Sequence, residues 1–154
     1  MSLDPRTLAQ LLETLRRFVD DRLIPREPEV AESDEMPADV IAEMREMGLF
    51  GLSIAPEYGG LGLSTEEEML AMLILARAAP AFRSIFATNV GIGSQGIAID
   101  GTEAQQARYL PRLASGESIG SFALTEPDVG SDAASLRTPA RRDGAGHVLP
   151  GTNR

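Results

Sequence analysis

The sequence contains no cysteine and no tryptophan, and it contains a single histidine, His147. Without cysteine the chain forms no disulfide, no thiolate metal site and no cysteine nucleophile. A Ser-His-Asp triad would depend on His147 alone, and a metal site is not expected from one histidine without cysteine partners. We therefore expect His147, which follows a glycine-rich turn, to be an exposed strand residue.

Basic residues are also scarce, because 14 lysines and arginines face 23 acidic residues, for a net charge of −9. So acidic a surface argues against nucleic acids and anionic membranes as main partners. No apolar run is long enough to span a bilayer, and charges interrupt the apolar residues of the N-terminus, so no signal peptide is predicted. These features favour a soluble, cytoplasmic protein with a hydrophobic content of 43%, enough for a core.

Helical periodicity dominates the first three-quarters of the chain. Asp4-Pro5 is typical of a helix start, whereas Ser64 with Glu67 and Thr102 with Gln105 match the capping box. The predicted helices cover about residues 5–23, 37–47, 65–79, 82–99 and 103–114, and the helix at 82–99 is apolar on every face, which is typical of a core helix. We expect 27–35 to be a solvated acidic loop, 49–54 a buried apolar stretch, and 56–63 a glycine-rich loop packed against a neighbour.

A change to strand-like patterns follows. Residues 119–124 and 134–141 read as strands, 143–146 as a hairpin turn, and 147–149 as the start of a third strand. Two or three strands would leave many main-chain N–H and C=O groups at the edges of a sheet unpaired. The pattern therefore suggests a β domain that is cut off. The predicted fold is mainly α: an N-terminal helical bundle domain at 1–116 and the first strands of a truncated β-barrel-like domain at 117–154.

One glycine motif is a false lead. Residues 91–96 match G-x-G-x-x-G, but a dinucleotide site needs a strand before the motif and a helix after it. Here the glycines lie inside the apolar helix, so we expect them to permit close packing against a neighbour or a slender ligand.

The most distinctive stretch is the polar run at 125–132, which follows the apolar segment 119–124. Pro127 stiffens it and pushes Glu126 towards an extended conformation, while Gly130 permits close approach to the main chain. Such a loop presents N–H and O–H donors to a bound heterocycle or carbonyl, although it is equally a common way to build a turn. Nothing in the sequence raises the pKa of its carboxylates, so Glu126, Asp128 and Asp132 are expected to form a solvated acidic turn.

Three motifs in order resemble the acyl-CoA dehydrogenase family of flavoproteins. Residues 125–132 match T-E-P-x-x-G-S-D, residues 56–64 resemble P-E-x-Y-G-G-L-G-L-S, and residues 101–117 resemble G-T-x-x-Q-K-x-x-Y-L-P-x-L-x-x-G-E. The resemblance implies an N-terminal helical domain, a middle β domain, a C-terminal four-helix domain and usually a tetramer. It also implies FAD as cofactor, an acyl-CoA substrate that is oxidised to an enoyl-CoA, and an electron-transfer flavoprotein as acceptor.

The same resemblance assigns cofactor contacts. It implies that main-chain groups of Phe122 and Leu124, with the hydroxyl and N–H of Thr125, face the pyrimidine edge of the flavin. Gly130 and Ser131 would complete the cradle, where donors stabilise the negative charge that develops on reduction. The position of Ser131 would also lie against the substrate.

The apolar helix would line the end of the acyl-chain pocket through Ile85, Thr88, Asn89 and Ile92, although a plain core role fits them as well. The catalytic glutamate of the family would lie beyond Arg154, so no catalytic residue is assigned in this chain, and we expect the chain alone to hold flavin weakly or not at all. Two other readings stay open: a flavin oxidase or monooxygenase on the same fold, and a helical interaction module without chemistry.

Overall fold

The computed structural model describes residues 3–153. The chain divides into two compact units, Met1–Ser121 and Phe122–Arg154. The first unit is helical, and the second holds one short hairpin within irregular chain. Among the described residues, no helix is both long and apolar enough to cross a membrane.

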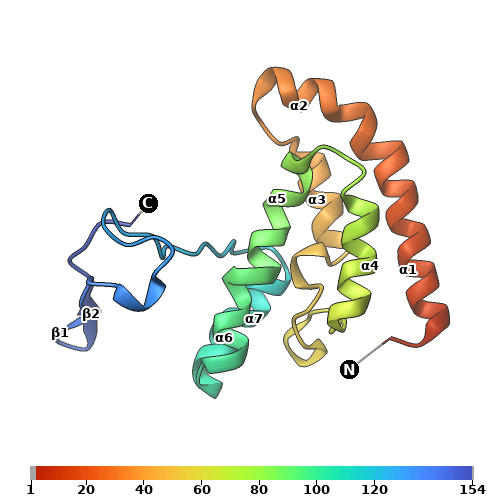
Figure 1. Ribbon diagram of the computed structural model, residues 1–154. Coiled ribbons are helices and arrows are strands. Elements are labelled where there is room, and N and C mark those ends of the chain that lie inside the picture. Colours follow the sequence, from red (N-terminus) through yellow and green to blue (C-terminus); the bar gives the residue numbers. More distant parts are fainter. Residues whose placement is uncertain (1–2, 154) are drawn as a thin grey trace. The chain divides into compact units, whose positions relative to one another are not determined.

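Over residues 3–121, the part of the first unit that the structure describes, the chain forms seven α-helices. Figure 1 shows how they are arranged. They are α1 (Pro5–Phe18), α2 (Glu27–Ser33), α3 (Ala38–Glu46), α4 (Thr65–Leu75), α5 (Pro80–Thr88), α6 (Ser94–Asp100) and α7 (Glu103–Ala114). A π-helical segment, Val19–Leu23, extends α1, and a second one, Asn89–Gly93, joins α5 to α6 without a break. The mainly helical prediction is thus confirmed, whereas the two π-helical segments were not foreseen.

Local capping residues start α1, α4 and α7 where the sequence predicts. The carboxylate of Asp4 accepts hydrogen bonds from the main-chain N–H groups of Arg6 and Thr7. Both predicted capping boxes form, at Ser64 before α4 and at Thr102 before α7. Each box satisfies main-chain donors that a helix N-terminus would otherwise leave without a partner.

The predicted acidic loop at 27–35 is wrong, because residues 27–33 form α2. Pro28 lies in the first turn, where a main-chain N–H has no partner inside the helix and where proline is therefore tolerated. Val30 buries its side chain, and Asp34 ends the helix in the left-handed conformation with φ of 55°. Proline here starts a helix instead of preventing one.

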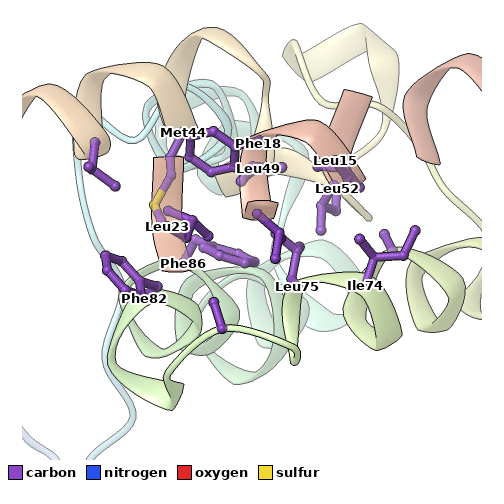
Figure 2. Packing of buried hydrophobic residues seen from close by; sticks show 14 of the residues in the cluster. Leu15, Phe18, Leu23, Met44, Leu49, Leu52, Ile74, Leu75, Phe82 and Phe86 are labelled. Atoms are coloured by element: carbon purple, nitrogen blue, oxygen red, sulfur yellow. The ribbon is translucent and has the colours of Figure 1, made fainter. Parts of the chain in front are cut away.

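The core lies between α1, α3, α4 and α5, and α1 runs beside α4 (Figure 1). Figure 2 shows how the large side chains of these helices and of the stretch after α3 meet in it. The rings of Phe50 and Phe86 pack edge to face, with centroids 6.4 Å apart. The stretch 82–99 was predicted to be buried on every face, and this is right only for its first part. Phe82 and Phe86 are buried, but Ile92 and Ile99 are 55% and 72% exposed.

The loop between α3 and α4 is packed as predicted. Leu49, Phe50 and Leu52 are completely buried. The main-chain N–H groups of residues 61, 62 and 63 donate back to the carbonyls of residues 51, 54 and 52 at 2.8, 2.9 and 2.8 Å. A Cβ built on Gly60 would lie 2.0 Å from the carbonyl oxygen of Ile54, so residues 51–54 and 60–63 of this loop approach each other so closely that only glycine fits at position 60.

The second unit contains the antiparallel strands β1 (Arg141–Asp143) and β2 (Gly146–Val148). Their turn confirms the predicted hairpin, and His147 is exposed as expected. The predicted strand at 119–124 is wrong, because this segment has no ladder partner. The predicted strand at 134–141 is wrong except for Arg141, which begins β1, and residues 133–135 form a 3₁₀ turn. Extended propensity alone does not make a strand, because the main-chain groups need a neighbour to pair with.

Candidate functional site

The polar run at 125–132 forms a tight turn. The main-chain N–H of Glu126 donates to the carbonyl of Val129 at 3.0 Å, and the N–H of Val129 donates back at 3.2 Å. Pro127 occupies the second position of this four-residue turn, where its fixed φ is favourable. Val129 is buried and Asp128 is exposed, so one apolar side chain of the turn is removed from solvent.

The carboxylate of Glu126 is the structural centre of this turn. It is only 8% exposed, and it accepts hydrogen bonds from the main-chain N–H groups of Arg137 and Thr138 at 2.9 and 2.8 Å. The expectation of a fully solvated acidic turn is therefore wrong for Glu126, although it holds for Asp128 and Asp132. Its partners lie 11 and 12 residues further along, too far for a local pattern to reveal them.

The electrostatics of Glu126 follow from these contacts. Hydrogen bonds from the hydroxyl of Thr138, and then from the main-chain N–H groups of Arg137 and Thr138, lower the pKa of Glu126 from its ordinary value. The carboxylate is thus ionised and held inward at neutral pH. By bonding to residues 137 and 138 it closes a loop that contains Gly130 and Ser131.

The predicted cofactor contacts are accessible. Phe122 is 56% exposed, Leu124 is half-buried, and Thr125, Gly130 and Ser131 are exposed. In residues 3–153, the hydroxyls of Thr125 and Ser131 make no hydrogen bond to the protein, so both are free to donate to a ligand. The expectation that these positions end a buried strand is wrong, and their role as cofactor contacts stays a prediction.

Other contacts hold the same segment. The side-chain amide of Asn153 donates to the carbonyl oxygen of Ala123 at 3.2 Å, with a weaker contact to that of Leu124 at 3.5 Å. A hollow of about 260 Å³ lies beside the turn. Its lining contains none of the five predicted cofactor contacts and consists of Glu126, Pro127, Asp128, Arg137, Thr138, Pro150 and Thr152.

The predicted acyl-chain contacts separate into two groups. Thr88 and Ile92 are exposed on neighbouring turns, as a pocket lining requires. Ile85 packs against the core, and Asn89 is completely buried with its amide bonded to main-chain groups. Ile85 and Asn89 are therefore structural residues. The local sequence does not single out Asn89, because Arg83 and Gln95 are polar residues of the same stretch.

The comparisons with known proteins agree with this geometry. The family model for the N-terminal domain of acyl-CoA dehydrogenases matches residues 6–117. The chain belongs to the acyl-CoA dehydrogenase family. An acyl-CoA dehydrogenase of Bacillus subtilis (strain 168) is 36% identical over 138 residues, which cover 90% of this chain and 36% of that protein.

Solved structures with the same fold are found as well. A glutaryl-CoA dehydrogenase from Mycobacterium smegmatis in complex with FADH2 matches with a TM-score of 0.83 and 38% identity, covering 98% of this chain and 39% of that one. An electron transferring flavoprotein of Acidaminococcus fermentans matches with a TM-score of 0.85 and 29% identity, covering 98% and 40%. This family member therefore spans little more than a third of the length of its relatives.

Proposed function

We propose that the chain is the N-terminal portion of a flavoenzyme that oxidises acyl-CoA thioesters to enoyl-CoA with FAD. The observation that carries the proposal is the family match over 6–117, followed directly by a turn whose two hydroxyl donors are free. Bound FAD would accept the hydrogen removed from Cβ of the substrate. The domain boundary at 116 and 117, with a truncated β domain after it, belongs to the same proposal.

The residues of the turn fit a flavin edge. Thr125 and Ser131 offer free hydroxyls, and Gly130, with no atom within 4 Å of a built Cβ, leaves room for a ligand against its main chain. The carboxylate of Glu126 accepts hydrogen bonds from the main-chain N–H groups of Arg137 and Thr138, and none from the hydroxyls of Thr125 and Ser131. Donors at this edge stabilise negative charge that develops during reduction.

The remaining assignments rest on the family resemblance. Main-chain groups of Phe122 and Leu124 would complete the flavin contacts, while Ser131, Thr88 and Ile92 would touch the acyl-CoA. The base that takes the α proton, the homotetrameric assembly and the contact with an electron-transfer flavoprotein would depend on chain beyond these residues. A cytoplasmic location is part of the same proposal.

The test uses the complete protein encoded by the gene. We expect it to purify with bound FAD, and we expect anaerobic addition of an acyl-CoA to bleach the visible flavin absorbance. Thr125→Val, which removes a hydroxyl but keeps the shape, should weaken FAD binding about tenfold, the loss of one hydrogen bond in a desolvated site. Thr152→Val removes an exposed hydroxyl from the same unit and serves as the control.

Two results would contradict the proposal. A complete protein that takes up no FAD when FAD is supplied would exclude the flavoenzyme, and unchanged flavin absorbance with a series of acyl-CoA thioesters would exclude the substrate class. Equal FAD affinity of Thr125→Val and Thr152→Val would remove Thr125 from the contact set.

A further inference from the structure

Asn89 is a fully buried amide that joins three distant segments. Its Nδ2 donates to the carbonyl oxygens of Phe50 and Leu113 at 3.1 and 3.0 Å. Its Oδ1 accepts the main-chain N–H of Gly120 at 2.7 Å. The side chain thus links the stretch after α3, the end of α7 and the segment that leaves the first unit.

The same segment also lies unusually close to the helix that carries Asn89. A Cβ built on Gly93 would lie 3.2 Å from the Cα of Gly120, and one built on Gly120 would lie 3.0 Å from the Cα of Gly93. Such distances are tighter than most Cβ contacts in proteins, so a side chain at either position would push the facing main chain away by a few tenths of an ångström. Gly91 and Gly96, the other glycines of the run at 91–96, have nothing within 4 Å of a built Cβ.

Among the described residues, Gly120 is the last one before the turn whose main-chain N–H donates a hydrogen bond to the first unit. Ser118 donates to the carbonyl of Arg112 at 3.0 Å, and Gly120 donates to Asn89. In the described chain, no main-chain N–H between Gly120 and Glu126 makes a hydrogen bond. Only Ser121 separates the fixed Gly120 from Phe122, the first of the proposed flavin contacts.

Core packing alone does not explain an amide at this position. Burying an amide costs free energy unless each of its polar groups finds a partner, and an apolar side chain here would leave the main-chain groups of Phe50, Leu113 and Gly120 without this partner. Here both hydrogens and the oxygen of Asn89 are used, each toward a main-chain group. A fully satisfied buried polar network of this kind specifies one position for the segments that it joins.

We propose that Asn89 and Gly93 are positioning residues that hold the chain at Gly120 and so set where the flavin-binding segment 122–125 begins. This inference rests on the proposed function. Asn89 itself would touch neither flavin nor substrate.

The test compares four proteins: the complete wild-type protein and its variants Asn89→Leu, Gly93→Ala and Gly91→Ala. Asn89→Leu removes all three hydrogen bonds. Gly93→Ala removes no polar group, and its added methyl group presses on the Cα of Gly120 at 3.2 Å and on the carbonyl oxygen of Thr88 at 3.1 Å. Gly91→Ala is the matched control, because it makes the same change in the same π-helical segment where the added Cβ meets open space. FAD affinity is measured by fluorescence quenching, and exchange of the Gly120 amide by hydrogen–deuterium exchange of a peptide spanning 117–121.

We expect Asn89→Leu and Gly93→Ala to speed amide exchange in 117–121 and to raise the FAD dissociation constant about tenfold or more, whereas Gly91→Ala leaves both within twofold of wild type. The flavin absorbance spectrum of the first two should also shift, which general loss of stability does not produce. If both variants lower the melting temperature but bind FAD as tightly as Gly91→Ala, the inference is overturned. If the wild type binds no FAD, the proposed function is wrong. The positioning role is then wrong as well, even if slow exchange shows that the Gly120 amide is hydrogen-bonded.

Discussion

Gly60 offers the sharpest test of the packed loop between α3 and α4. A methyl group at this position would lie 2.0 Å from the carbonyl oxygen of Ile54 and 2.7 Å from that of Gly51. Both contacts are with main chain, so no side chain can rotate away. Gly60→Ala must therefore push residues 60–63 of the loop away from residues 51–54.

The size of the effect follows from the bonds that depend on this contact. Three main-chain hydrogen bonds, from residues 61, 62 and 63 to carbonyls of residues 51, 54 and 52, cross the loop here. At about 1 kcal/mol of net stability for each, losing them would lower the free energy of unfolding by about 3 kcal/mol. Gly59→Ala is the matched control: its φ is +85°, but the added Cβ meets nothing within 4 Å, so left-handed strain of about 1–2 kcal/mol is its only cost.

Urea denaturation of the 154-residue chain, followed by circular dichroism, measures both variants against wild type. We expect the midpoint to fall further for Gly60→Ala than for Gly59→Ala, with similar slopes. If Gly60→Ala costs no more than Gly59→Ala, the close approach of the two loop strands is not a source of stability, and the reasoning fails.

The remaining predictions concern the turn and the core. The pKa of Glu126 lies below its ordinary value of 4.5, so its hydrogen bonds stabilise the turn fully above pH 4.5 and are lost as the pH falls through the lowered pKa. The amides of Arg137 and Thr138, followed by NMR hydrogen exchange corrected for intrinsic rates, should therefore lose protection only at acidic pH. Loss of protection near neutral pH would contradict this. Glu126→Gln should weaken that protection at neutral pH and abolish its dependence on acid. Phe86→Ala should cost about 3–5 kcal/mol in thermal unfolding because the ring is fully buried, whereas Phe122→Ala, which removes an exposed ring, should leave stability nearly unchanged; equal costs would refute the assignment of the core.

Local signals predicted local structure well. The capping boxes at Ser64 and Thr102 place the starts of α4 and α7, because the residues that satisfy each N-terminus lie within three positions of one another. Gly48, with φ of 71°, ends the region of α3 as predicted, since a left-handed residue after a helix favours glycine. The family motifs likewise identified the fold, which the family match confirms.

What failed depended on distant partners. The segments at 119–124 and 134–140 have strand-like composition, but a strand exists only beside another strand, and composition does not reveal whether one is there. Burial of Glu126 likewise depends on Arg137 and Thr138, which lie beyond any local pattern. The role of Asn89 needs three segments to meet, so it was visible only in the folded chain.

The candidate site was predicted only in part. The residues of the turn were found because the motif is contiguous, and their exposure agrees with a binding role. The assignment of these residues to a flavin, and of Thr88 and Ile92 to an acyl chain, stays a prediction.

The pairing of α1 with α4 has a consequence for synthesis on the ribosome. Chains emerge from the N-terminus, so α1 leaves the exit tunnel well before α4 has been made. Until residues 65–75 emerge, Leu15 and Phe18 have no α4 to pack against, although both are buried in the finished fold. The apolar face of α1 therefore stays exposed during this part of translation. Termination of translation before α4 would release a nascent chain whose exposed apolar face could bind chaperones or aggregate.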